Sequence, residues 1–185
     1  YSGFDVTIWL RSEGSIGRTK PKLEAIYKDY LAAIDKMATE EGKQPGNWCL
    51  GICEDLSKFD PEAAKAQAEK AYKSLVLELD MKKAFDGADS DEKTILVTNS
   101  STMLPSTFAK YTGRPEKYLS LHFANEIWKN NTAEVMGQAK TSKEAYDAVV
   151  AFASDIHMIP LQLHKEKNGY ILNSMLVPFL LSALD

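Results

Sequence analysis

The sequence is poor in cysteine, and this shortage excludes a scaffold held together by disulfides. Among 185 residues there are two cysteines, Cys49 and Cys53. Three residues separate them, which is neither the spacing of a zinc knuckle nor that of a redox pair. Reduced cysteines are typical of proteins in a reducing compartment, so we expect a cytoplasmic protein.

The sequence also lacks an excess of positive charge. Its net charge is −4 and its isoelectric point is about 5.5. Such a balance favours neither nucleic acid nor an anionic membrane as a partner. We therefore expect the partners to be small molecules or other proteins.

A long uninterrupted apolar run is missing as well. The longest apolar stretch is NGYILNSMLVPFLLSALD, residues 168–185, and it contains Asn173, Ser174 and Pro178. It is too short and too interrupted for a membrane span, and it predicts a buried helix with a proline kink. The chain starts at Tyr1 without a basic and then apolar leader, so we expect the true N-terminus to lie upstream.

What the sequence does contain is an alternation of strand and helix patterns. An alternation of this kind predicts an α/β fold with a doubly wound, mainly parallel sheet. In the predicted helix 141–156, Thr141 and Glu144 have the spacing of a capping box. The predicted strands are 3–10, 74–79, 94–98, 118–123, 132–138 and 158–163, and the predicted helices are 22–37, one from Pro61, 81–89, 105–113 and 141–156.

Polar residues stand where two predicted strands end. His122 is near the end of the strand YLSLHF, Glu134 follows twelve residues later, and Ser101 comes after the strand TILVT. Ligands of open α/β sheets bind outside the carboxyl ends of the strands, so we expect these side chains to converge there. The alternatives are structural: His122 can be a buried histidine that merely needs a partner, and Ser101 can cap the next helix.

Three segments carry a resemblance to a known family. In order and spacing, TNSSTM, LHFANEIWKNNTAEV and NGYILNSMLVPFLLSAL resemble the motifs of the L-3-hydroxyacyl-CoA dehydrogenase family. The resemblance is close over residues 94–185 and looser before them. It implies a Rossmann-like dinucleotide-binding domain at 1–167, and at 168–185 the first helix of a C-terminal helical domain through which two copies would form a homodimer.

The resemblance also implies an activity. The protein would be an oxidoreductase of fatty acid metabolism that interconverts a 3-hydroxyacyl-CoA and a 3-ketoacyl-CoA with a nicotinamide cofactor. Two alternatives stay open, which are a dehydrogenase of a free hydroxy acid or sugar acid and a non-catalytic binding module. The implied roles are general base for His122, its orienting carboxylate for Glu134, hydrogen bonds to substrate for Ser101 and Asn173, and contact with the cofactor for Asn99, Ser101 and Asn125.

Two features depart from the family. The glycine-rich turn GxGxxG, which cradles a pyrophosphate, is absent together with its strand, and we expect about twenty residues upstream. Around 89/90 the family has a further strand and helix. We expect the natural protein to contain an element there, because loss of a central strand would leave two unpaired ladders.

The cofactor expectation comes from the end of the first predicted strand. It reads Leu10, Arg11, Ser12, with no acidic residue before Glu13. An acidic residue at this place binds the ribose of NAD, whereas an arginine suits the 2′-phosphate of NADP. Arg11 and Ser12 therefore favour NADP over NAD. The alternative is that Arg11 is solvated and Glu13 reaches the ribose.

Overall fold

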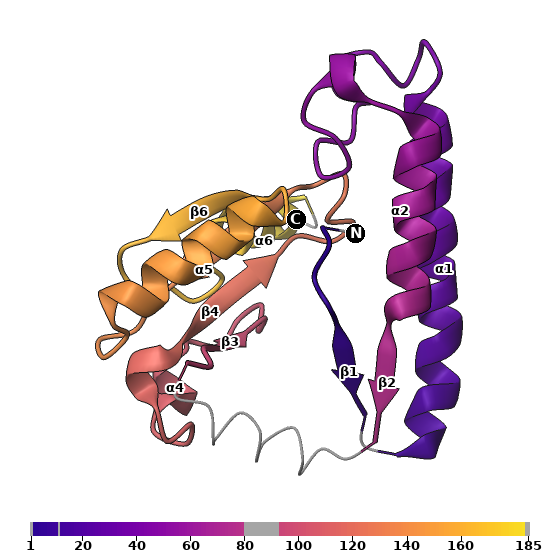
Figure 1. Cartoon of the computed structure of the whole chain (residues 1–185). Coiled ribbons are helices and arrows are strands. Elements are labelled where there is room, and N and C mark those ends of the chain that lie inside the picture. The colour runs from indigo at the N-terminus through magenta and orange to yellow at the C-terminus, as the bar shows by residue number, and fades with distance from the viewer. Residues whose placement is uncertain (1, 11, 80–92, 184–185) are drawn as a thin grey trace. The chain divides into compact units, whose positions relative to one another are not determined.

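The computed structural model describes residues 2–10, 12–79 and 93–183 (Figure 1). The chain divides into two compact units, residues 1–92 and 93–185, and each is described by itself. Arg11, the predicted helix 81–89 and the junction at 89/90 lie outside the described residues. The predicted domain boundary after residue 167 stays a prediction.

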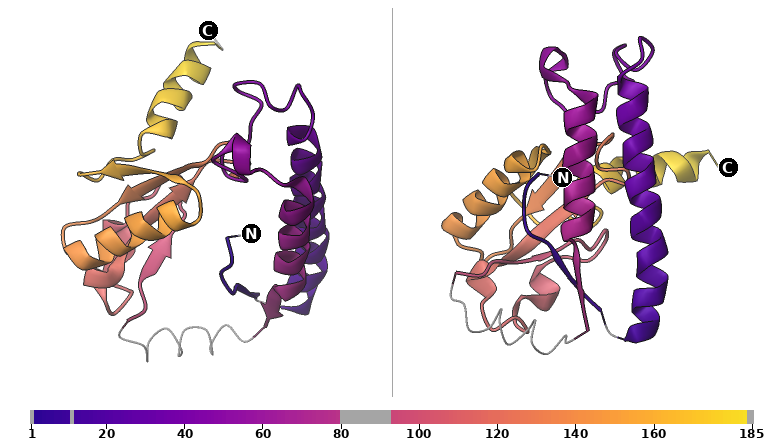
Figure 2. Two further views of the ribbon diagram at one scale, coloured as in Figure 1. Left: turned by 45° about the horizontal axis from the view of Figure 1, so that its top comes forward. Right: turned by 45° about the vertical axis from the view of Figure 1, so that its right-hand side comes forward.

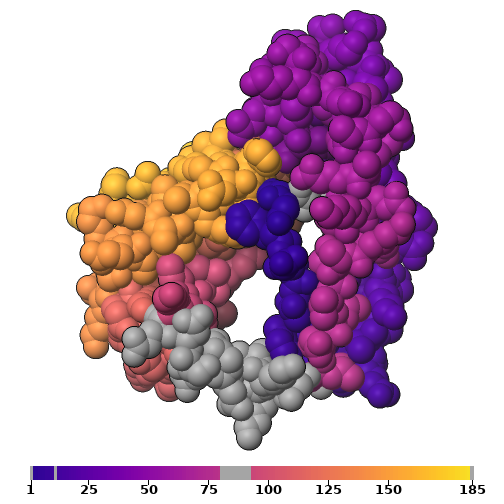
Figure 3. All heavy atoms as spheres, in the orientation of Figure 1, coloured from indigo at the N-terminus to yellow at the C-terminus, as the bar shows by residue number. Residues whose placement is uncertain are grey.

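The first unit pairs two short parallel strands with two long helices. Thr7 lies opposite Val76 in the sheet. The two helices run side by side, as both views in Figure 2 and the space-filling view in Figure 3 show. Tyr27 and Tyr72 stack between them with ring centroids 4.5 Å apart. The elements are β1 (Thr7–Trp9), α1 (Glu13–Met37), the 3-10 helix η1 (Leu56–Lys58), α2 (Pro61–Ser74) and β2 (Val76–Glu78).

The helices of this unit begin where local capping allows. The Asp60 carboxylate accepts hydrogen bonds from the amides of Glu62 and Ala63, and Pro61 occupies the first turn, so the predicted start of α2 is confirmed. In contrast, α1 begins at Glu13, earlier than the predicted residue 22. Glycines and Pro21 dilute the apolar pattern of its first half, although the helix continues through them.

The second unit holds a four-stranded sheet in the order β3-β4-β5-β6. β3 is parallel to β4 and β5 to β6, whereas β4 and β5 are antiparallel. With the parallel β1–β2 pair, most described pairings are parallel, as the sequence predicts. The elements are β3 (Leu96–Thr98), α4 (Ser106–Ala109), the 3-10 helix η2 (Pro115–Lys117), β4 (Tyr118–Phe123), β5 (Thr132–Met136), α5 (Lys143–Asp155), β6 (Ile159–Leu163) and α6 (Leu172–Ser182).

The core of the second unit lies between the sheet and α5, which crosses β4, β5 and β6 (Figure 1). Side chains of the central strands meet small and branched residues of the helix there, and their burial fixes the register of the strands. Because the register is fixed, the polar residues at the strand ends have fixed neighbours. The buried residues of this cluster are Leu119, Leu121, Ala133, Val135, Val149, Ala153 and Met158.

Two predictions for helix starts and ends were wrong. α5 is capped by Ser142, whose hydroxyl accepts from the amide of Ala145, and not by a box of Thr141 and Glu144. Thr141 is engaged elsewhere, because its hydroxyl donates to the carbonyl of Tyr118. α4 ends at Ala109, before the predicted end at Gly113.

One expectation of burial was wrong as well, and one strand is shorter than predicted. None of the residues of α6 is buried, and Phe179 is 69% exposed, although the helix does contain Pro178. The first strand is shorter than predicted, and Phe4 and Val6 beside it are exposed. An apolar pattern predicts which face of a helix or strand is apolar, but that face is buried only if another element packs against it. Within the described ranges, no helix combines the length and apolar character that crossing a bilayer requires.

Candidate active site

The centre of the candidate site is a cross-strand pair. His122 on β4 lies directly opposite Glu134 on β5 in the antiparallel ladder. The imidazole Nδ1 is 2.8 Å from the carboxylate Oε2, and both residues are buried. The fixed register of two core strands therefore holds the dyad together.

The contacts of the ring define its tautomer. A carboxylate only accepts hydrogen bonds, so Nδ1 of His122 carries the proton that is donated to Glu134. The lone pair then lies on Nε2, which is 3.2 Å from the hydroxyl oxygen of Ser101. The Ser101 hydroxyl donates to Nε2, and the same nitrogen is positioned to receive a proton from a substrate hydroxyl.

Glu134 is completely buried and is held by three hydrogen bonds. Besides the contact with His122, its Oε1 accepts from the backbone amides of Ile171 at 2.8 Å and Leu172 at 2.9 Å. These amides belong to the start of α6, where the helix dipole favours a negative charge. Since a buried charge without partners is costly, this arrangement lets Glu134 stay in the core.

Ser101 follows β3 in the sequence and is held by a contact with α6. The side-chain amide of Asn173 donates to the carbonyl of Ser101 at 3.2 Å. Ser100, not Ser101, accepts the amide of Met103 in the turn that follows, and Pro105 occupies the N-cap position of α4. The capping alternative for Ser101 therefore finds no support in the geometry.

The two predicted asparagines differ in their placement. Asn99 follows β3, and its side-chain oxygen accepts the amide of Phe123 at 3.0 Å, which ties the ends of β3 and β4 together. Asn125 lies in the loop after β4, where its carbonyl accepts from the side chain of Asn130. The structure thus places Asn99 at the shared strand edge and links Asn125 to its own loop.

The predicted cofactor residues of the first unit lie after β1. Ser12 is the N-cap residue of α1, and its hydroxyl is 3.1 Å from that of Ser15. Arg18 donates from Nη2 to the Ser15 hydroxyl at 3.1 Å. Arg18 was not among the residues predicted from the sequence. Its signal was the three-residue spacing of Ser12, Ser15 and Arg18, which only becomes meaningful once α1 starts at Glu13.

A second residue that the sequence analysis missed is Tyr170. It is completely buried, and its ring stacks on the imidazole of His122 with centroids 4.6 Å apart and an interplanar angle of 18°. Its hydroxyl donates to the carbonyl of Ser100 at 2.7 Å. Burial raises the pKa of this hydroxyl above its usual value, so it stays protonated and able to donate.

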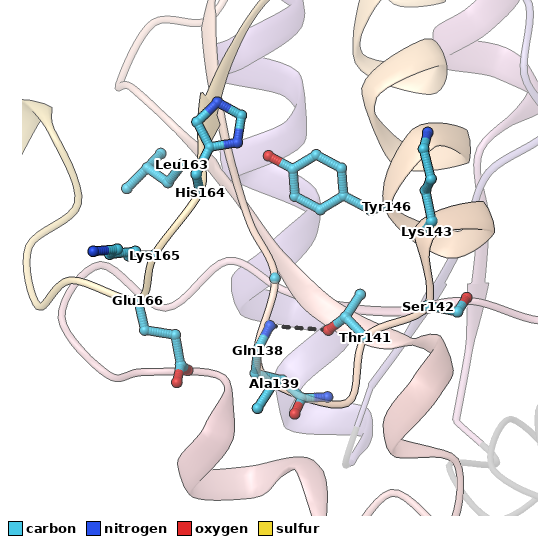
Figure 4. A pocket seen from close by; sticks show the side chains of 11 residues that line it. Gln138, Ala139, Thr141, Ser142, Lys143, Tyr146, Leu163, His164, Lys165 and Glu166 are labelled. Carbon is cyan, nitrogen blue, oxygen red and sulfur yellow. Dashed lines mark hydrogen bonds between the residues drawn. The ribbon is translucent and has the colours of Figure 1, made fainter.

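A separate pocket of about 530 Å³ opens at the carboxyl ends of β5 and β6 (Figure 4). Much of its polar lining is engaged within the protein, since Thr141 Oγ1 accepts from the amide of Gln138 and Glu166 accepts from that of Ser106. Its described lining residues do not include His122, Glu134 or Ser101. Among the described residues, no group of three or more His, Cys, Asp or Glu could hold a metal ion.

Each unit, taken by itself, offers polar groups of a kind that binds part of a dinucleotide. In the first unit, Ser12, Ser15 and Arg18 supply hydroxyls and a cation after β1, where a strand of a doubly wound sheet holds the adenosine ribose. In the second unit, Asn99 supplies an amide after β3. The glycine-rich turn for the pyrophosphate does not occur in the 185 residues.

Comparison with known proteins identifies the family of this chain. Residues 1–167 match the family model described as 3-hydroxyacyl-CoA dehydrogenase, NAD binding domain. The chain is 29% identical over 188 residues to a 3-hydroxybutyryl-CoA dehydrogenase of Clostridioides difficile, covering 98% of this chain and 63% of that protein. The chain thus spans less than two thirds of the length of this relative.

Solved structures support the same fold. A diketoreductase that acts on dicarbonyl compounds is 35% identical with a TM-score of 0.73, and the match covers 98% of this chain and 63% of that one. An NAD+-dependent FHMPC 5-dehydrogenase is 16% identical with a TM-score of 0.69, and the match covers 100% and 57%. The chain folds as a Rossmann-like domain. It belongs to the 3-hydroxyacyl-CoA dehydrogenase NAD-binding domain family.

Proposed function

We propose that the protein containing this chain interconverts a 3-hydroxyacyl-CoA and a 3-ketoacyl-CoA by hydride transfer, with His122 as general base. The observation that carries the proposal is the continuous set of contacts Glu134–His122–Ser101 at one edge of the sheet. It leaves one imidazole nitrogen unprotonated where a secondary alcohol can reach it.

The dyad explains how the alcohol loses its proton. Nε2 of His122 accepts the hydroxyl proton, and the imidazolium that forms is stabilised by Glu134 at Nδ1. Two amides of α6 also donate to the Glu134 carboxylate and hold it in place. A nicotinamide, when bound, would supply the acceptor for the hydride of the alcohol carbon. In the reverse direction, the imidazolium returns the proton to the oxygen of the ketone.

Ser101 and Asn173 suit the binding of substrate oxygens. The Ser101 hydroxyl lies 3.2 Å from Nε2, so an alcohol in contact with His122 also reaches Ser101. Asn173 is fixed against the Ser101 carbonyl, and its remaining amide hydrogen bonds are available to a substrate. Such donors stabilise the oxygen as its charge changes during the reaction.

The CoA thioester is supported by the family and by the dehydrogenase of Clostridioides difficile. The dyad itself recognises only the alcohol. A second candidate, a dehydrogenase of a free hydroxy or keto acid, is favoured by the similarity to a diketoreductase. If the substrate is a 3-hydroxyacyl-CoA, we propose that residues outside this chain bind the CoA moiety and join two copies in a homodimer.

For the cofactor we propose NADP in preference to NAD. The sequence positions of Arg11 and Ser12 carry this proposal, and the contact of Arg18 with the Ser15 hydroxyl supports it. An arginine offers a planar and permanently charged fork that matches phosphate. Glu13 in the first turn of α1 is the competing residue, since a carboxylate there accepts hydrogen bonds from an unphosphorylated ribose.

Steady-state kinetics of the full-length protein test the function. We expect acetoacetyl-CoA to be reduced with a kcat/KM at least about tenfold above that of free acetoacetate. A preference for free acetoacetate favours the second candidate. Failure to bind NADH or NADPH, measured by fluorescence titration, contradicts both and leaves a binding module.

A further inference from the structure

The turn before α6 has an unusual backbone. Gly169 and Tyr170 have φ angles of +74° and +53°, and Tyr170 is followed within two residues by the start of α6. Glycine adopts this left-handed region freely, whereas a tyrosine pays about 1 kcal/mol or more to do so. Tyr170 therefore keeps this conformation because its surroundings hold it.

The surroundings of Tyr170 supply a contact for every polar group. Its amide donates to the carbonyl of Lys167 at 3.1 Å, and its carbonyl accepts from the hydroxyl of Ser174. Its phenol hydroxyl donates to the carbonyl of Ser100, a residue 70 positions away in the sequence. The side chain is thus anchored at both ends, to the turn before α6 and to the end of β3.

The same turn serves both members of the dyad. The left-handed conformation at Tyr170 directs its ring onto one face of the imidazole of His122. The next two amides, those of Ile171 and Leu172, point at Oε1 of Glu134. A different backbone at Tyr170 would move the ring and both amides together.

Hydrogen bonds to Glu134 and Ser101 alone would leave the imidazole free to tilt about the axis through its two nitrogens. The stacked ring of Tyr170 removes this freedom, since it covers one face of the imidazole with the two ring centroids 4.6 Å apart. Nε2 then stays within reach of Ser101. General bases lose efficiency steeply when they are misplaced, because proton transfer requires hydrogen-bond geometry.

We propose that Tyr170 is a positioning residue, whose ring holds the imidazole of His122 in the orientation that proton transfer requires. The inference rests on the proposed function, because it assigns a task to Tyr170 only if His122 is the base. Tyr170 acts through His122, and it has no place among the groups that react.

Kinetics of full-length variants provide the first test. Tyr170→Leu and Tyr170→Met remove the ring, and either one that folds should lower kcat by about 10- to 100-fold with KM changed less than about threefold. Tyr170→Phe keeps the ring and loses only the hydroxyl, so kcat should stay within about threefold of wild type. A folded Leu or Met variant with wild-type kcat overturns the proposal.

Tyr146→Phe is the matched control. Tyr146 lies in the same unit, burial raises the pKa of its hydroxyl too, and this hydroxyl donates to the carbonyl of Val135 at 3.2 Å. This variant also loses one phenol-to-carbonyl hydrogen bond, at the residue after Glu134, but it leaves the ring on His122 and the side-chain hydrogen bonds of the dyad in place. We expect an unchanged kcat, and a loss equal to that of the Tyr170 ring variants would show that general destabilisation explains both.

A spectroscopic test separates this inference from the proposed function. The proton between Nδ1 of His122 and Glu134 should give a downfield proton NMR signal, assigned by its loss in His122→Gln. We expect the signal in wild type and Tyr170→Phe, and its broadening or loss in a ring-removing variant. Loss of the signal in folded Tyr170→Phe, or its persistence without the ring, contradicts the inference. If the wild type shows the signal but turns over no hydroxyacyl-CoA, the proposed function fails and the positioning contact stands.

Discussion

Inside each of the two units, a different kind of polar contact stabilises the fold. In the first unit, side-chain hydrogen bonds mostly join near neighbours, such as Ser12 with Ser15 or Trp48 with the carbonyl of Cys53. In the second unit, they join Glu134 to Ile171 and Tyr170 to Ser100, which are 37 and 70 residues apart. The candidate chemistry therefore depends on the tertiary fold of the second unit, whereas the first unit relies on helix packing and local caps. Changes in the second unit should affect turnover, and changes in the first should affect cofactor choice or stability.

The largest effect should follow His122→Gln in the second unit. We expect kcat for acetoacetyl-CoA reduction to fall by about 10² to 10⁴, the usual range for a lost general acid or base, while circular dichroism stays unchanged. His164→Gln is the control, since this exposed histidine lines the separate pocket. Wild-type turnover in folded His122→Gln would end the assignment.

Glu134→Gln should have a smaller effect on rate and a visible effect on pH dependence. The base survives, but it loses the negative charge that favours its protonated form. More acid is then needed to protonate the ring, so the acidic limb of kcat/KM for alcohol oxidation should move to lower pH. Glu126→Gln is the control, because that side chain is 60% exposed and pairs only weakly with Lys129. An unchanged profile with a lower melting temperature would make Glu134 a structural residue.

In the first unit, Arg11→Ala and Arg18→Ala should change cofactor preference. Arg18→Ala removes the cation beside the Ser15 hydroxyl, and Arg11→Ala removes the arginine that precedes Ser12 in the sequence, so in each the ratio of kcat/KM for NADPH to that for NADH should fall by about tenfold. Lys20→Ala, on the exposed surface of the same helix, should leave the ratio unchanged. A strong preference for NADH that neither arginine variant alters would show that Glu13 governs the choice.

The smallest effect on activity should come from Asp60→Ala. The variant loses the cap of α2, which costs about 1 kcal/mol of stability, a typical value for an N-cap. We expect a lower midpoint in urea and an unchanged kcat/KM. A drop in kcat/KM comparable to that of Glu134→Gln would contradict the division of roles between the two units.

The sequence predicts much of the second unit because its strands are regular. The strand YLSLHF was predicted at 118–123 and lies there as β4. The approach of His122 to Glu134 was expected from the ends of the strands, but the structure brings them together by direct pairing of antiparallel β4 and β5, which the sequence did not predict. The first half of α1 could not be anticipated, because Gly14, Gly17 and Pro21 are poor helix formers that tertiary context overrides.

Other parts of the site could not be predicted from the sequence. The partners of Glu134 on α6 are backbone amides, and any residue type at Ile171 or Leu172 supplies them. The stacking of Tyr170 on His122 depends on a left-handed turn between β6 and α6. A tyrosine rarely adopts this conformation, so its residue type does not predict the turn. The exposure of α6 is equally invisible, because burial depends on what packs against a helix.

The pH dependence of kcat/KM for oxidation of a 3-hydroxyacyl-CoA tests the role of the dyad most directly. Wild type and His122→Gln of the full-length protein are compared with 3-hydroxybutyryl-CoA at saturating cofactor. If His122 accepts the substrate proton, the wild-type rate falls on the acidic side as the imidazole becomes protonated, and His122→Gln loses this limb together with most of its rate. An acidic limb that persists unchanged in His122→Gln would contradict the account, because another group would then remove the proton.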